Sequence, residues 1–162
     1  MSPPSQTRSK PLRSQTKEGA VFTGDVMDGA RFEDVSLKRA SFRDVSLAGA
    51  RLEDIDASRA QLKNAKLDGV SVDDASFQRA KFRNASFRAA SFSDVDFRDA
   101  KLSNASFDGA RFDDVSLANV AITDANIRGL TIDGVDIEKL LGERANAAKP
   151  KRAAASRAKR KR

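Results

Sequence analysis

The side chains that could take part in chemistry are serines, carboxylates and basic residues, and most of them recur at fixed intervals. The 162 residues include no His and no Cys. The usual general base near neutral pH, the thiol nucleophile and the commonest metal ligands are therefore missing. The serines recur with the repeat described below at positions that face outward. The sequence also has no glycine-rich phosphate loop. We therefore expect a protein that is not an enzyme and that has no cofactor and no metal site.

Carboxylates form the first group that could recognise a partner. They recur at a spacing of 20 residues and are interrupted by Arg31, Arg51 and Arg111. Like charges stacked on neighbouring strands repel, so such rows need counter-charges or a cationic partner. A solvated face interlaced with arginine is the alternative. The candidate acidic face consists of Glu33, Asp34, Glu53, Asp54, Asp73, Asp74, Asp94, Asp113 and Asp114.

Basic residues form a second group, concentrated at the C-terminus. Residues 140–162 carry nine basic side chains and one acidic side chain, whereas residues 20–139 carry 17 and 21. A polybasic segment can neutralise phosphates in a salt-sensitive way that does not depend on base sequence. It has no aromatic residue on which bases could stack. A solubilising tail is the alternative. The candidate nucleic-acid residues are Lys149, Lys151, Arg152, Arg157, Lys159, Arg160, Lys161 and Arg162.

A five-residue repeat runs from about residue 20 to residue 139 and must position the carboxylates of the candidate acidic face. Each unit reads small apolar, polar, large apolar, polar, polar, as residues 75–94 show four times over. A period of five matches neither a helix nor a long strand, so we expect very short strands joined by turns, with the apolar residues inside. The core-stacking phenylalanines are Phe32, Phe42, Phe77, Phe82, Phe87, Phe92, Phe97, Phe107 and Phe112.

The repeat resembles that of the pentapeptide-repeat family, A(D/N)LXX. It stands here as Ala40-Ser-Phe-Arg-Asp44 and Ala60-Gln-Leu-Lys-Asn64, with the acidic or amide residue at the fifth position instead of the second. The resemblance implies an all-β fold, a right-handed four-sided β-helix solenoid of about six coils. Some members of the family bind DNA gyrase in place of DNA, which makes gyrase a candidate partner.

A second period, of twenty residues, supports four repeats per coil. Glycines, aspartates and arginines each recur at this spacing, and Arg39, Arg59 and Arg79 are one such series. Neighbouring coils then lie about 4.8 Å apart, and six coils make a rod roughly 30 Å long. A basic stripe is expected on one side, made of Arg43, Lys63, Lys81, Arg83 and Lys101. Ala57 is a small residue at a large-residue position, and we expect a locally underfilled core there.

The chain outside the repeat divides into three segments. We expect residues 1–19 and 149–162 to be disordered tails because they offer little to bury. Residues 136–148 are expected to form a short capping helix after the solenoid of residues 20–139. Asp136 would be its N-cap, and Leu140 and Leu141 would close the last coil.

The function predicted from these patterns is that of an interaction rod. Its flat, charge-striped faces would bind a protein partner of unknown identity, and its basic tail would contact nucleic acid without sequence preference. A DNA mimic that acts on gyrase is the alternative. No apolar run approaches the roughly 20 residues of a membrane span, and we expect a cytoplasmic protein without a membrane partner. The sequence leaves both a monomer and a homodimer open.

Overall fold

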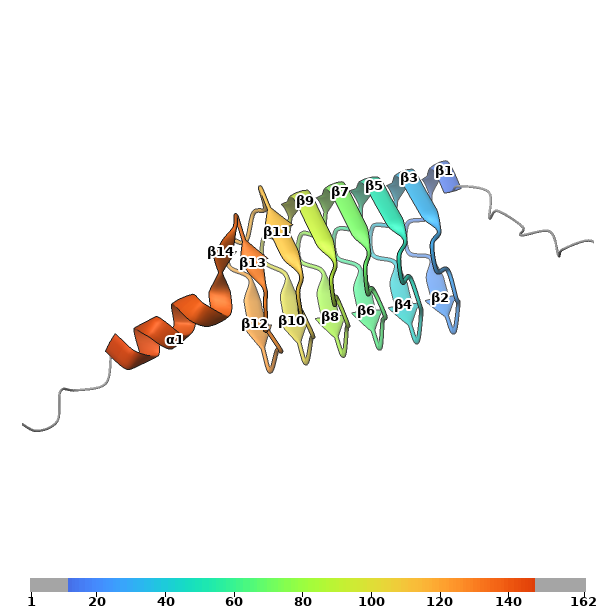
Figure 1. Cartoon of the computed structure of the whole chain (residues 1–162). Coiled ribbons are helices and arrows are strands. Elements are labelled where there is room, and N and C mark those ends of the chain that lie inside the picture. The colour runs from blue at the N-terminus through green and yellow to red at the C-terminus, as the bar shows by residue number, and fades with distance from the viewer. Residues whose placement is uncertain (1–11, 148–162) are drawn as a thin grey trace, which may run out of the picture.

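The protein is a β-solenoid of about six coils followed by one helix (Figure 1). The computed structural model describes residues 12–147. The elements are β1 (Leu12–Thr16), β2 (Val21–Thr23), β3 (Arg31–Ser36), β4 (Ser41–Arg43), β5 (Arg51–Asp56), β6 (Gln61–Lys63), β7 (Ser71–Ser76), β8 (Lys81–Arg83), β9 (Ser91–Asp96), β10 (Lys101–Ser103), β11 (Arg111–Asp113), β12 (Ala121–Thr123), β13 (Thr131–Ile132), β14 (Val135–Asp136) and α1 (Ile137–Ala147).

Two parallel sheets run along the rod. The order of one is β1-β3-β5-β7-β9-β11-β13-β14, and the order of the other is β12-β10-β8-β6-β4-β2. Every parallel pair joins residues twenty apart, as in Phe32↔Leu52 and Phe42↔Leu62. Each residue therefore lies directly above its equivalent in the preceding coil, and equivalent residues form rows along the rod.

The chain turns a corner every five residues, which gives each coil four sides. Positive φ angles recur at this interval, at Asp34 (54°), Arg39 (57°), Asp44 (56°) and Gly49 (65°). At the second and fourth of these corners a β-turn closes, with the N–H of Ala40 donating to the carbonyl of Leu37 at 3.0 Å. Gly, Asn and Asp adopt this left-handed conformation most readily.

The core consists of the inward rows. All nine phenylalanines predicted for it are buried, and the described residues include no buried polar or charged residue. The rings of Phe87 and Phe107 stack at 5.2 Å with an interplanar angle of 4°. Phe87 also meets Phe82 and Phe92 edge to face. Burial of each phenylalanine side chain stabilises the fold by about 1.5–3 kcal/mol. The coils rich in phenylalanine therefore contribute strongly to the stability of the rod.

The solenoid begins earlier than the sequence predicted. Strand β1 pairs in parallel with β3 in the same register of twenty, Leu12↔Phe32 and Gln15↔Val35. The prediction that residues 12–16 belong to a disordered tail was therefore wrong. The reason is that a sheet edge supplies backbone hydrogen bonds whatever the side chains are, and the polar composition of this segment concealed the pairing. Residues 1–11 lie outside the described part of the chain.

The C-terminal helix begins where the sequence predicted, but it does not close the last coil. The N–H of Lys139 donates to Asp136 Oδ1 at 3.0 Å, as expected of an N-cap. Leu140 and Leu141, however, are 39% and 52% exposed, so the prediction that they cap the core was wrong. The antiparallel β13–β14 hairpin redirects the chain, and α1 leads away from the end of the rod (Figure 1).

Candidate interaction faces

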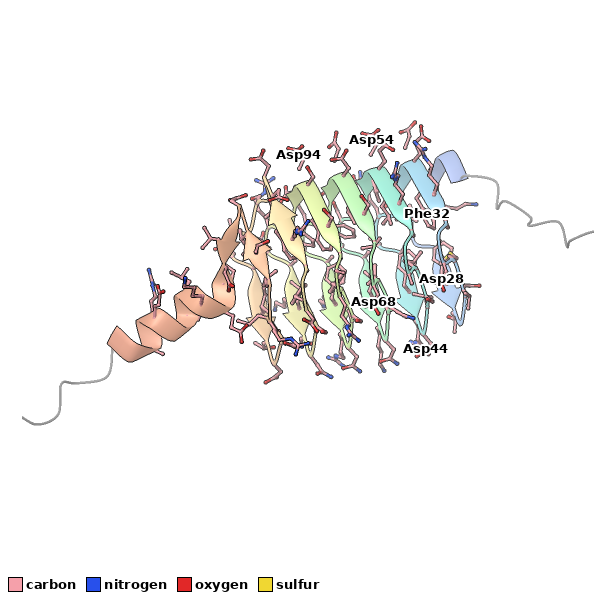
Figure 2. The ribbon with its side chains drawn as sticks, in the orientation of Figure 1. Asp28, Phe32, Asp44, Asp54, Asp68 and Asp94 are labelled. Carbon is pink, nitrogen blue, oxygen red and sulfur yellow. The ribbon has the colours of Figure 1, made fainter. Side chains whose placement is uncertain are left out.

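Charged side chains form rows on two separate parts of the rod. We call the first the acidic edge. It consists of the corner residues Asp34, Asp54, Asp74, Asp94 and Asp114 with the adjoining Glu33, Glu53, Asp73 and Asp113. Figure 2 shows Asp54 and Asp94 along one long edge of the rod, and Asp44 on the opposite edge.

The acidic edge brings together every carboxylate of the predicted acidic face. Glu33, Glu53 and Asp73 are direct register partners on β3, β5 and β7. The pKa of Asp54 is raised above its ordinary value of 3.8 by partial desolvation, and next by the charge of Asp74 in the adjacent coil. At this position both causes oppose the charged form of Asp54.

An arginine partly offsets the acidic edge at its N-terminal end. Arg31 Nε lies 3.1 Å from Glu33 Oε2, and Arg31 Nη2 lies 3.0 Å from Glu53 Oε2. These groups are substantially exposed, so the pairs stabilise the fold only weakly. They do lower the net charge that this end of the edge presents to a partner.

The diagonally opposite corner carries a row of three amides, Asn64, Asn84 and Asn104, between Asp44 and Asp124. Asn84 Nδ2 donates to Asn64 Oδ1 at 2.9 Å, and Asn104 Nδ2 donates to Asn84 Oδ1 at 2.9 Å. Asn64 in turn donates to Asp44 Oδ1 at 2.7 Å. This corner has the same backbone conformation as the acidic corner, with φ of 54° at both Asn64 and Asn84. A corner of this backbone conformation can therefore hold hydrogen-bonded amides instead of the charged aspartates of the acidic edge.

The second charged region, which we call the basic face, combines a corner row with an adjacent side. The side carries the basic stripe predicted from the sequence, and its residues are register neighbours on β4, β6, β8 and β10. The corner adds three arginines from consecutive coils. The basic face consists of Arg39, Arg43, Arg59, Lys63, Arg79, Lys81, Arg83 and Lys101.

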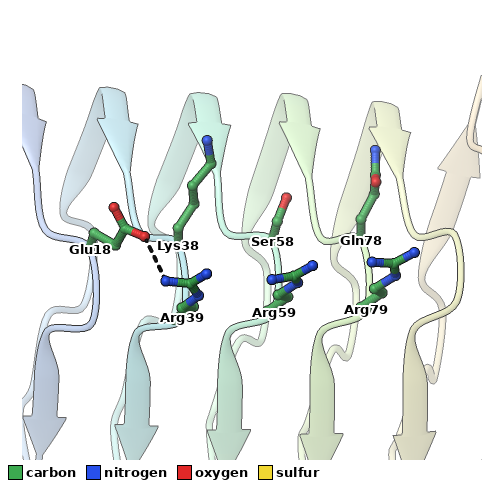
Figure 3. Close-up of a pocket in the computed structure, with 7 residues that line it drawn as sticks. All are labelled: Glu18, Lys38, Arg39, Ser58, Arg59, Gln78 and Arg79. Atoms are coloured by element: carbon green, nitrogen blue, oxygen red, sulfur yellow. Dashed lines mark hydrogen bonds and ion pairs between the residues drawn. The ribbon is translucent and has the colours of Figure 1, made fainter.

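A groove of about 220 Å³ runs beside the corner arginines (Figure 3). Arg39, Arg59 and Arg79 form one wall as a row, while Lys38, Ser58 and Gln78 form a parallel row. At the ends of the row, Arg39 lies 3.4 Å from Glu18 and Arg79 lies 3.7 Å from Asp99. The sequence predicted the spacing of the three arginines but not the groove beside them, which depends on how the side chains of two adjacent rows lie.

The side between the acidic edge and the basic face is held by local ion pairs. Arg98 Nη2 lies 2.6 Å from Asp96 Oδ2, and Lys38 Nζ lies 3.0 Å from Asp56 Oδ2. Hydrogen bonds from the Arg98 side chain lower the pKa of Asp96, and partial desolvation opposes this shift. Because these charges pair with one another, the side that carries them is nearly neutral. This neutral strip separates the acidic edge from the basic face.

The candidate nucleic-acid residues of the C-terminal tail, 149–162, lie outside the described part of the chain. Within residues 12–147, no group of carboxylates is arranged to hold a metal ion. In the same range, no helix is long and apolar enough to cross a membrane.

Comparisons with known proteins agree with this geometry. The family model of the pentapeptide repeat region matches residues 35–112 and 70–141, which together span well over half of the chain. The chain belongs to the pentapeptide-repeat family. No curated protein matches it.

Several solved structures resemble this pentapeptide-repeat protein. One is AT2G44920, a pentapeptide repeat protein from the Arabidopsis thaliana thylakoid lumen. It is 28% identical, with 65% of this chain and 70% of that chain covered and a TM-score of 0.54. HetL, a pentapeptide repeat protein involved in heterocyst differentiation regulation from Nostoc sp. strain PCC 7120, is 23% identical over 76% of this chain and 60% of its own, with a TM-score of 0.37. QnrB1, a plasmid-mediated fluoroquinolone resistance protein, is 17% identical over 83% and 90%, with a TM-score of 0.39.

Proposed function

We propose that this pentapeptide-repeat protein is a non-enzymatic interaction rod of the cytoplasm. Its acidic edge binds a cationic groove on a protein partner, and its basic C-terminal tail contacts nucleic acid. The observation that carries the proposal is the row of five corner aspartates, Asp34, Asp54, Asp74, Asp94 and Asp114, at one position in successive coils. Like charges stacked in such a row repel each other, and a cationic partner would relieve that repulsion.

The experiment compares the wild-type protein with a variant in which all five corner aspartates are replaced by Asn. Asn adopts the left-handed corner readily, and the amide row of Asn64, Asn84 and Asn104 occupies the same backbone conformation in this molecule. The variant therefore keeps the rod and removes five charges. Proteins retained from a cell lysate by the two forms are compared by mass spectrometry. We expect a cationic partner to be retained by the wild-type protein and lost with the variant. Identical sets of retained proteins would refute the acidic edge as the binding site.

The second candidate is a DNA mimic directed at DNA gyrase. The same acidic row favours it, because a rigid line of carboxylates can occupy a groove that normally binds phosphates. Purified gyrase is the probe, and its supercoiling activity is measured with increasing wild-type protein and with the five-Asn variant. Inhibition or protection by the wild-type protein that the variant lacks would support this candidate. Equal activity with both forms would exclude it.

The tail is tested separately by replacing the Lys and Arg residues of 149–162 with Gln in the full chain. Binding of a fluorescent DNA duplex is then measured as a function of salt concentration. If the tail is the nucleic-acid contact, the substitution lowers both the affinity and the salt dependence. An unchanged affinity would show that the tail is not needed.

A further inference from the structure

The basic stripe within the basic face stacks positive charges on neighbouring strands. Arg43, Lys63 and Arg83 are direct register partners across three strands. Lys81 and Lys101 are a further register pair. Within residues 12–147, none of these five side chains makes an ion pair. Like charges directly opposite each other are destabilising.

The corner arginines strengthen this observation through their backbone. Arg39, Arg59 and Arg79 have φ angles of 57°, 62° and 58°. Among the described residues with positive φ, all others except Ala89 are Gly, Asn or Asp, the residues that adopt this conformation most easily. The same corner holds Asp99 and Asn119 in the next two coils. The backbone conformation therefore favours other residues at these three positions. The exposed ion pairs of Arg39 with Glu18 and of Arg79 with Asp99 offset this only weakly. Strained positions of this kind point to function.

We propose that the basic face is a docking surface for the phosphate backbone of duplex nucleic acid. The proposal rests on the proposed function, in which charged faces of the rod bind partners, and it names a partner for the basic face. It does not require the acidic edge or the C-terminal tail to bind anything. Arginine contributes five of the eight basic side chains, and its planar fork matches phosphate oxygens bidentately.

The basic face carries about as many charges as a duplex of equal length carries phosphates on its two strands together. The eight side chains lie on four successive coils, which span about 14 Å at the usual strand spacing. A duplex of this length carries roughly eight phosphates, since it has one charge per about 1.7 Å. Parallel pairing holds the backbone of these strands in register, so the positions that carry the charges are evenly spaced along the rod.

The composition of the face favours a duplex over a membrane or a single strand. The exposed large hydrophobic side chains of the described chain are Val21, Val26, Ile122, Val135, Leu140 and Leu141. None belongs to the coils that carry the basic face, so the face lacks the apolar anchors of a membrane-surface site. It also lacks aromatic side chains on which unpaired bases would stack. Contacts would be made to phosphates without base recognition.

The test uses the full chain in which Arg39, Arg59 and Arg79 are all replaced by Asn. Asn119 already occupies this corner in a later coil, so the variant should fold with an unchanged or higher melting temperature. The matched control replaces Arg31, Arg51 and Arg111 by Gln, which removes three positive charges from the side that carries the acidic edge. Both are made with the native tail and with the tail in which Lys and Arg are replaced by Gln.

Binding of a fluorescein-labelled DNA duplex of mixed sequence is measured by anisotropy between about 50 and 200 mM salt. We expect the corner variant to reduce the slope of log K against log salt by about 0.9 for each arginine that contacts a phosphate, up to about 2.7 in total. The control should keep the wild-type slope, and the difference should persist when the tail is neutralised.

Three results would overturn the proposal. The corner variant and the control could lower the affinity equally, which would show that binding depends on the net charge of the protein and not on the position of the arginines. Binding could disappear with the tail substitution and be unaffected by the corner variant, which would assign nucleic-acid binding to the tail alone. Polyglutamate could compete as strongly as the duplex at equal charge, which would identify an acidic protein as the partner. The five-Asn variant of the acidic edge should bind DNA at least as well as the wild type, so failure of this proposal is distinguishable from failure of the acidic-edge function.

Discussion

Replacing Ala57 by Leu tests whether the core packs as rows along the rod. Ala57 is buried between Leu37 and Phe77 in its row. A cavity of about 20 Å³ lies beside it, lined by apolar side chains that include Leu37, Phe42 and Phe77. The leucine would extend the row into this space, as the sequence predicted for an underfilled position.

The size of the effect follows from two opposing contributions. Leucine adds three carbon atoms to a buried site, which stabilises the fold by about 2.4 kcal/mol at roughly 0.8 kcal/mol per carbon. The cavity has room for only part of this volume, so neighbouring side chains must shift, which costs about 1–3 kcal/mol. The net change lies between a loss of about 0.5 and a gain of about 1.5 kcal/mol.

The assay is thermal and urea unfolding followed by circular dichroism. A change of 1 kcal/mol moves the melting temperature of a chain of this size by about 2–4 °C. Leu37→Ala, in the same row, is the matched control and should lose about 2–5 kcal/mol. A loss of more than about 2 kcal/mol for Ala57→Leu would refute the reasoning, because position 57 would then not be an underfilled place in the leucine and phenylalanine row.

Three further predictions concern the corners, the neutral strip and the helix. Asn84→Ala removes the amide hydrogen bonds to both neighbouring coils and leaves Ala at a φ of 54°, so urea unfolding should show a loss of about 1–3 kcal/mol; unchanged stability would mean that the amide row does not stabilise the coils. Arg98 lowers the pKa of Asp96 below 3.8, so the stability that Asp96 contributes is present above that pH and is lost as the pH falls through the lower folded-state value. The melting temperature of Asp96→Asn should therefore lie below that of the wild type at neutral pH and approach it in acid, and a pH-independent difference would contradict this. Leu140→Ser combined with Leu141→Ser should change the stability by no more than about 0.5 kcal/mol per site, whereas a large loss would restore the capping role that the structure does not show.

The sequence predicted most of the solenoid because each level of the fold repeats. The period of five determines which residues point inward, and the period of twenty determines which residues lie above one another. The register pair Phe32↔Leu52 follows directly from that spacing. The acidic edge could be predicted for the same reason, since a row needs only the spacing of its members.

The parts that sequence reasoning missed are those where side-chain pattern does not decide the structure. Strand β1 forms by backbone pairing, and its Gln15 occupies the register position of Val35 without resembling it. The direction of α1 depends on the β13–β14 hairpin, so the apolar character of Leu140 and Leu141 was no guide to their burial. The groove beside the corner arginines depends on how the side chains of two adjacent rows lie, which the spacing of the residues does not determine.

The comparison of three corner rows in this one molecule, of amides, aspartates and arginines, supports the proposal that the charges serve binding. The amide row shows that hydrogen-bonded asparagines satisfy a left-handed corner, with Asn84 bonded to both neighbouring coils at 2.9 Å. The acidic corner has the same backbone conformation, yet Asp54 has a raised pKa because it is partly desolvated and lies beside other carboxylates. The arginine corner adopts a conformation that arginine does not favour. Because the solenoid has a neutral and better-bonded alternative for these positions, folding does not account for the charged rows. The oppositely charged partners proposed above would relieve the repulsion within each row.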